Sequence, residues 1–403
     1  MDVYLARQPI FDRSQSVIAY ELLHRSGDVN YITETDGNLA TSEVISSSMF
    51  NIGLTKLTRG KKAFINFTKK LLEDEIAFLL PKDLVGIEIL EDVEADLKTY
   101  TACKKLSNRG YTILLDDFDL NSGCLDLLGL VDIVKIDFQK TDLLERAKIV
   151  QYFKGRKIRL LAEKVDTLED YKYALENGYD YFQGYFFCKP SVVRSKAFPT
   201  TKIQKLRLLK EVYDPDMDFD KVADLIKQDP NFSYKLLRCI NTLAYALRFQ
   251  VNSIHQALVL LGQKEITKWA SLICLHTISS DKPDELIITA LSRARLCESI
   301  ARQVGLKDQD SELFLTGLLS LLDTFFDQTM EELLKELPLA DKVKGALLGD
   351  SNSHKQILEV AILYERGFLN EAFDLAKRAF MLDEKLLTEY YLESLCMADK
   401  PWE

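Results

Sequence analysis

The stretch Ile113-Leu114-Leu115-Asp116-Asp117-Phe118-Asp119 places three apolar residues directly before two adjacent carboxylates. The apolar run predicts a buried strand of a parallel sheet. Two neighbouring carboxylates repel each other, so one of them takes up a proton unless a cation lies between them. The pair therefore indicates a metal site at a strand end, although Asp residues also follow strands in ordinary solvated turns.

Length and composition narrow the class of protein. A chain of 403 residues is too long for one hydrophobic core, so we expect at least two domains. The net charge of −10 argues against binding to a nucleic-acid duplex. No apolar stretch approaches the ~20 residues of a membrane-spanning helix. The first residues lack a signal-peptide pattern, and the seven cysteines form no C-x-x-C pair, so we expect a cytoplasmic protein with no membrane contact.

The first half of the chain alternates short strand-like runs with amphipathic helical patterns. This alternation predicts βαβ units and a parallel sheet, closed as a (β/α)₈ TIM-like barrel. The predicted strands cover residues 3–8, 17–23, 63–66, 85–89, 112–116, 133–136, 158–163 and 181–183.

Polar residues lie at or near the carboxyl ends of seven of these strands. They are Glu21, Asn66, Glu88, Asp116, Lys135, Glu163 and Gln183. In a barrel these ends meet on one face, which carries the chemistry.

Their charges predict a site for divalent cations. The four carboxylates in this set and Asp117, together with Lys135, leave a net charge of −4, which two divalent cations would neutralise. Carboxylate and amide oxygens suit Mg²⁺ or Mn²⁺. Paired cations about 3.5–4 Å apart can hold a phosphodiester and activate water for its hydrolysis. Lys135 either orients that water or forms a structural ion pair inside the barrel.

Ordered motifs at these strand ends resemble those of EAL domains. Glu21-Leu22-Leu23-His24-Arg25, preceded by Gln8-Pro9-Ile10, is similar to E-A-L-x-R. Further matches are Ile65-Asn66-Phe67-Thr68, Glu88-Ile89-Leu90-Glu91, Asp116-Asp117-Phe118, Val134-Lys135-Ile136-Asp137, Leu161-Ala162-Glu163, and Gln183-Gly184-Tyr185-Phe186 with Pro190. The resemblance covers residues 1–195.

The resemblance implies a barrel that binds the bacterial messenger cyclic di-GMP and hydrolyses it to the linear dinucleotide pGpG with one or two Mg²⁺ or Mn²⁺ ions. The implied metal ligands or their direct supports are Glu21, Asn66, Glu88, Asp116, Asp117 and Glu163. Lys135, Glu163 and Gln183 would serve the attacking water, and Arg25, Gln8 and Pro190 would contact the substrate. Glu91 and Asp119 would belong to the loop that supports the site.

Several residues depart from the family pattern. Leu22 replaces the alanine of E-A-L, and Asp119 replaces a glycine after the Asp pair, where glycine permits positive φ. Lys164 and Asp166 replace the glycine and the second glutamate of A-E-G-V-E. Three outcomes therefore stay open: hydrolysis, binding without turnover as a sensor, and a barrel retained as a protein-interaction scaffold.

The second half of the chain reads as helices. We predict a linker at 196–203 and an all-helical domain at 204–403, because apolar spacings of three and four prevail. The run from Asp229 to Asn241 resembles D-P-x-L-x-x-K-L-L-R-x-x-N of HDOD domains, and Ser253 to Gly262 resembles their S-I-x-x-A-I-x-x-L-G. The resemblance implies a bacterial signalling protein whose helical domain holds no metal and binds a protein partner. A homodimer is compatible with it.

Overall fold

The structure is a computed structural model that describes residues 3–26, 54–120, 124–189, 200–240, 251, 253–278 and 282–398. The chain forms two compact units. The first comprises residues 1–189, 362–377 and 383–392, and the second comprises 190–361, 378–382 and 393–403. The predicted boundary at residue 195 and residues 196–199 of the predicted linker fall outside the described residues, whereas residues 200–203 belong to a helix that begins at Thr200. The domain limits stay a prediction.

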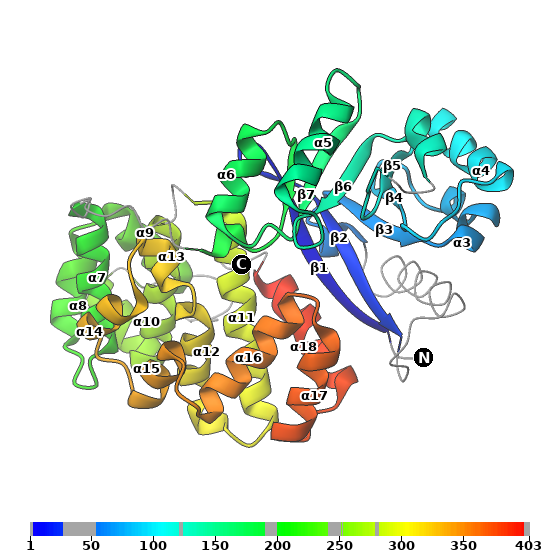
Figure 1. Ribbon diagram of the computed structural model, residues 1–403. Helices are drawn as coiled ribbons and strands as arrows, with labels where there is room; N and C mark the ends of the chain where they lie inside the picture. The colour runs from blue at the N-terminus through cyan, green and yellow to red at the C-terminus, as the bar shows by residue number, and fades with distance from the viewer. Residues whose placement is uncertain are drawn as a thin grey trace. The chain divides into compact units, whose positions relative to one another are not determined.

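The first unit contains a closed eight-stranded barrel, and this confirms the predicted TIM-like architecture (Figure 1). All eight predicted strands are present, and each neighbours the next one along the chain. Their bounds are β1 Val3–Asp12, β2 Val17–Ser26, β3 Lys62–Phe67, β4 Val85–Ile89, β5 Thr112–Leu115, β6 Ile133–Asp137, β7 Arg159–Glu163 and β8 Tyr181–Gln183.

The barrel differs from the predicted parallel sheet at its first strand. Strand β1 is antiparallel to both β2 and β8, whereas the other neighbours are parallel. The four residues between β1 and β2 are too few for a crossover helix, so the two strands form a hairpin. The register of this hairpin puts Gln8 directly opposite Glu21, which brings Gln8 to the site.

Short helical segments follow the strands and cover the barrel (Figure 1). They are α2 Leu54–Leu57, α3 Lys69–Glu73, η2 Ile76–Leu79, α4 Leu97–Asn108, η3 Leu125–Leu130, α5 Leu143–Phe153, α6 Leu168–Glu176 and η4 Phe186–Cys188. Side chains of Asp96, Asp142 and Thr167 cap α4, α5 and α6 by accepting hydrogen bonds from backbone N–H groups of the first turn. These caps fix the residues at which the three helices begin.

Helices make up the second unit and the end of the chain, as the periodicity predicts. They are α7 Thr200–Tyr213, α8 Phe219–Lys227, α9 Pro230–Ile240, α10 Ile254–Ile278, α11 Asp284–Gln303, η7 Lys307–Gln309, α12 Asp310–Leu319, α13 Leu322–Phe326, α14 Met330–Glu336, α15 Asp341–Leu348, α16 Ser353–Glu365, α17 Leu369–Phe380 and α18 Glu384–Ala398. Helix α11 packs against α12, and α10 packs against α7, α8 and α9. Among the described helices, none has the length and apolarity needed to cross a membrane.

Replacement of Gly184 by alanine is expected to destabilise the barrel. Gly184 has φ of +145°, and a Cβ atom there would lie 2.2 Å from the carbonyl oxygen of Val165. The loss in unfolding free energy should be about 1–3 kcal/mol, as for other overpacked sites. Urea unfolding measures it, with Gly129→Ala as the control, because a Cβ at Gly129 meets no atom within 4 Å. Equal stability of the two variants would contradict the tight fit.

Candidate metal centre

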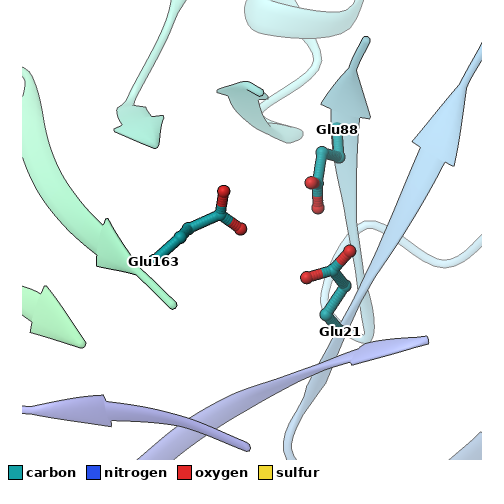
Figure 2. Close-up of side chains that lie close together, drawn as sticks. All are labelled: Glu21, Glu88 and Glu163. Carbon is teal, nitrogen blue, oxygen red and sulfur yellow. The ribbon is translucent and has the colours of Figure 1, made fainter. Parts of the chain in front are cut away.

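Three glutamates from separate strands converge inside the barrel mouth (Figure 2). Glu21 comes from β2, Glu88 from β4 and Glu163 from β7. Each offers a carboxylate oxygen, and these oxygens all lie within 4.8 Å of one another. The side chains point toward a common centre in Figure 2, and the three residues are no more than 7% exposed. We call Glu21, Glu88 and Glu163 the first acidic group.

The aspartate pair at the end of β5 forms a second acidic group with Glu163. Carboxylate oxygens of Asp116, Asp117 and Glu163 also lie within 4.8 Å of one another. Asp117 has a left-handed backbone with φ of 41°, and its N–H donates to Asp116 Oδ1 at 3.0 Å. The strand therefore ends in a turn that presents both carboxylates on the side of Glu163, the residue common to both groups.

The ammonium group of Lys135 lies among these carboxylates. Its Nζ is 2.6 Å from Glu163 Oε1 and 3.0 Å from Asp116 Oδ1. It lies 3.4 Å from Glu21 Oε2 and also pairs with Glu88. The side chain is 1% exposed, so Lys135 is a buried ion-pair partner of four carboxylates. The predicted role of Lys135 in orienting water remains a prediction.

Burial and mutual repulsion shift the acid–base behaviour of the cluster. Burial raises the pKa of Glu163 to about 8; repulsion from Asp116 and Glu21 adds to this rise, and Lys135 opposes it. Burial also raises the pKa of Glu88 well above its usual range. For Lys135, burial acts to lower the pKa, but the surrounding carboxylates outweigh it and hold the pKa well above the ordinary value. Without a cation the cluster thus retains protons.

Two amide side chains extend the first acidic group. Asn66 Nδ2 lies 3.5 Å from Glu21 Oε1. Gln183 Nε2 donates to Glu21 Oε2 at 2.6 Å and to Gln8 Oε1 at 2.9 Å. Gln8 in turn donates to the carbonyl oxygen of Arg366, which belongs to the same compact unit, at 2.8 Å. Gln8 therefore lies beside a predicted ligand, held by backbone and amide contacts.

The candidate ligand atoms of the cluster fit a hard divalent cation. Within the described residues, Glu88 Oε2 and Gln183 Oε1 are buried and accept no hydrogen bond. A buried acceptor without a donor is costly, whereas a cation would satisfy it. Carboxylate and amide oxygens are the ligands that Mg²⁺ and Mn²⁺ favour, so the residues present fit such an ion.

The remaining predicted site residues lie at the edge of the cluster or outside the described part. Glu91 is exposed, with Oε1 3.9 Å from the Nζ of Lys140. Asp119 follows Asp117 in the described part of its loop, while residues 121–123 of that loop are outside it. The side chain of Arg25 and all of Pro190 fall outside the described residues.

Sequence reasoning did not predict the contacts of two lysines beside the site. Lys140 Nζ forms an ion pair with Asp117 Oδ2, and Lys164 Nζ forms one with Asp137 Oδ2. Lys164 has φ of 52°, which agrees with its place where the family has glycine. That substitution was visible in the sequence. For Lys140, only its position three residues after Asp137 could have been a signal.

Chelation is expected to lower the melting temperature of the first unit and leave that of the second unchanged. A cation whose free concentration is 100 times its Kd stabilises the folded state by about 2.7 kcal/mol. With no cation, the pKa of Glu163 in the folded protein, about 8, lies above its pKa in the unfolded chain. The stability that this difference provides is lost as pH rises from the unfolded pKa through 8. The difference between EDTA and Mn²⁺ should therefore grow from pH 6 to pH 9. Calorimetric melts that coincide at every pH would contradict a bound cation.

The fold and this cluster define a class of protein: a TIM-like barrel with a candidate divalent-cation site at the carboxyl ends of its strands. Family models place the chain more narrowly. Residues 39–190 match the EAL domain and residues 198–347 match the HDOD domain. The chain belongs to the family of proteins that carry an EAL domain followed by an HDOD domain.

Curated relatives share both parts. YuxH of Bacillus subtilis (strain 168) is 38% identical over 404 residues, which cover 98% of each chain. The cyclic di-GMP phosphodiesterase CdgJ of Vibrio cholerae serotype O1 is 35% identical over 366 residues, covering 90% of this chain and 85% of CdgJ. Among solved structures, the Bacillus subtilis YkuI protein, in complex with c-di-GMP and calcium, gives a TM-score of 0.39 at 22% identity. That match covers 66% of this chain and 74% of YkuI.

Proposed function

We propose that this protein is a divalent-cation-dependent phosphodiesterase that hydrolyses cyclic di-GMP to linear pGpG. The observation that carries the proposal is the convergence of two acidic groups on one barrel mouth, with Lys135 buried among them. The relative CdgJ, named as a cyclic di-GMP phosphodiesterase and similar over most of both chains, supports the choice of substrate.

Each residue of the site would have a role that follows from its chemistry. A bound Mg²⁺ or Mn²⁺ supplies Lewis-acid stabilisation of the phosphodiester and lowers the pKa of water. Both acidic groups and Asn66 would hold one or two such ions. Lys135 would orient the attacking water, and a carboxylate of the cluster would accept its proton. Gln183 fixes Glu21 by a hydrogen bond, which keeps that carboxylate in place.

Substrate contacts come from the rim of the barrel in this proposal. Arg25 follows Glu21 on β2, and its planar guanidinium suits a phosphate of the substrate. Gln8 and Pro190 would complete the substrate contacts. The helical region would act as a non-catalytic module that binds a protein partner, and the protein would act in the cytoplasm, as a monomer or a homodimer.

A turnover assay with the full chain tests the proposal. Cyclic di-GMP is incubated with Mn²⁺, with Mg²⁺ and with EDTA, and formation of pGpG is followed by chromatography. We expect product with either cation and none with EDTA. Binding of cyclic di-GMP without product would select the sensor, and neither binding nor product would leave the scaffold. The observation that favours a weakly active or inactive barrel is the ion pair of Lys140 with Asp117, a residue of the second acidic group.

A further inference from the structure

Lys140 forms an ion pair with one carboxylate of the second acidic group. Lys140 Nζ pairs with Asp117 Oδ2 and lies 3.9 Å from Glu91 Oε1. Asp117 is one of the three residues of that group, together with Asp116 and Glu163. An ammonium group and a divalent cation would bind the same carboxylate oxygen at this position. Binding of one therefore excludes the other, or costs the repulsion between the two positive charges.

The backbone fixes Lys140 at this place. Asp137, the last residue of β6, is 2% exposed. Its Oδ1 accepts hydrogen bonds from the N–H groups of Gln139 at 2.6 Å and Lys140 at 3.1 Å. The carbonyl oxygen of Asp137 accepts from the N–H of Thr141 at 3.0 Å. A buried strand end thus holds the turn that carries Lys140, and its side chain reaches Asp117 from there.

The two acidic groups consequently differ. In the first, Lys135 pairs with one oxygen of each glutamate, but Glu88 Oε2 is buried and accepts no hydrogen bond from any described residue, so this oxygen is available to a cation. In the second, Asp117 already has a cationic partner. The side chain of Lys140 is 59% exposed, so its ammonium can move into water when it leaves Asp117. Lys135 cannot do the same, because it is 1% exposed.

We propose that Lys140 competes with the second divalent cation for Asp117, so that the two groups fill in sequence. The first ion binds at Glu21, Glu88 and Glu163, and the second binds when Lys140 leaves Asp117. Lys140 is then a positioning residue that sets the cation concentration at which the two-ion site assembles. This inference rests on the proposed function, because it takes the two groups to be cation sites.

Titration of the full chain with Mn²⁺ tests the inference without any substrate. Calorimetry gives the stoichiometry and the two dissociation constants, and the EPR signal of free Mn²⁺ gives an independent measure. Lys140→Met should tighten the second ion on the order of tenfold, because it removes the competing contact and a like charge. The first ion should bind nearly as before, and Lys140→Arg should resemble the parent chain.

Lys105→Met is the matched control. Lys105 is 53% exposed and forms one ion pair, with Glu75, on the outside of the barrel. This variant should bind both ions as the parent chain does. An unchanged second dissociation constant in Lys140→Met, or a change as large in Lys105→Met, would overturn the inference and leave the proposed function intact. Failure of every variant and of the parent chain to bind Mn²⁺ would overturn both.

Discussion

Replacement of Asp116 by asparagine is expected to lower kcat/KM for cyclic di-GMP by roughly 100-fold or more, since even residues that only orient a metal ligand often contribute about ten- to hundredfold. Asp116 takes part in the second acidic group and its Oδ1 lies 3.0 Å from Lys135 Nζ. The substitution keeps the shape of the side chain but removes a charge from the cluster. Initial rates of pGpG formation at saturating Mn²⁺ measure the effect.

The control for this variant is Asp126→Asn. Asp126 is exposed in η3, outside both acidic groups, and its substitution removes the same charge. Its rate should equal that of the parent chain, and circular dichroism should show that both variants are folded. If the Asp116→Asn variant retained the parent rate, Asp116 would have no part in the reaction. The description of the site as two acidic groups would then be wrong.

Replacement of Lys135 by methionine is expected to cost about 3–5 kcal/mol of unfolding free energy in EDTA, the usual loss when one partner of a buried ion pair is removed. Methionine has a similar length, but the four carboxylates would lose their shared cation. Protons can replace it, because burial raises the pKa values of Glu88 and Glu163. The loss should therefore be smaller at pH 6 than at pH 9, and Mn²⁺ should reduce it at either pH.

Urea unfolding of the Lys135→Met and Lys69→Met variants, with EDTA and with Mn²⁺, measures these effects. Lys69 is 35% exposed and pairs with Asp96 at 2.8 Å, a surface contact that solvent screens. Its variant should show a small loss that Mn²⁺ does not change. If Lys135→Met were as stable as the parent chain in EDTA at pH 9, the buried lysine would not hold the cluster together.

The pattern of the sequence was sufficient for the barrel and its acidic strand ends. Strand β4 covers Val85–Ile89, the same residues as the predicted strand, and Glu88 lies one residue before its end. The period of a strand and the position of its last polar residue are local properties, so they can be read without coordinates. The direction of β1 was not anticipated, because a strand pattern looks the same in either direction.

The sequence by itself determined the order of strands, the helical second half and the residues that meet at the barrel mouth. Each of these depends on hydrophobic period, chain connectivity and residue type, which are properties of neighbours along the chain. The tertiary structure decided which carboxylate each lysine pairs with: Lys135 with four of them, and Lys140 with Asp117. Such pairs join residues 19 to 114 positions apart in the chain, so only the closed barrel sets their distances and burial.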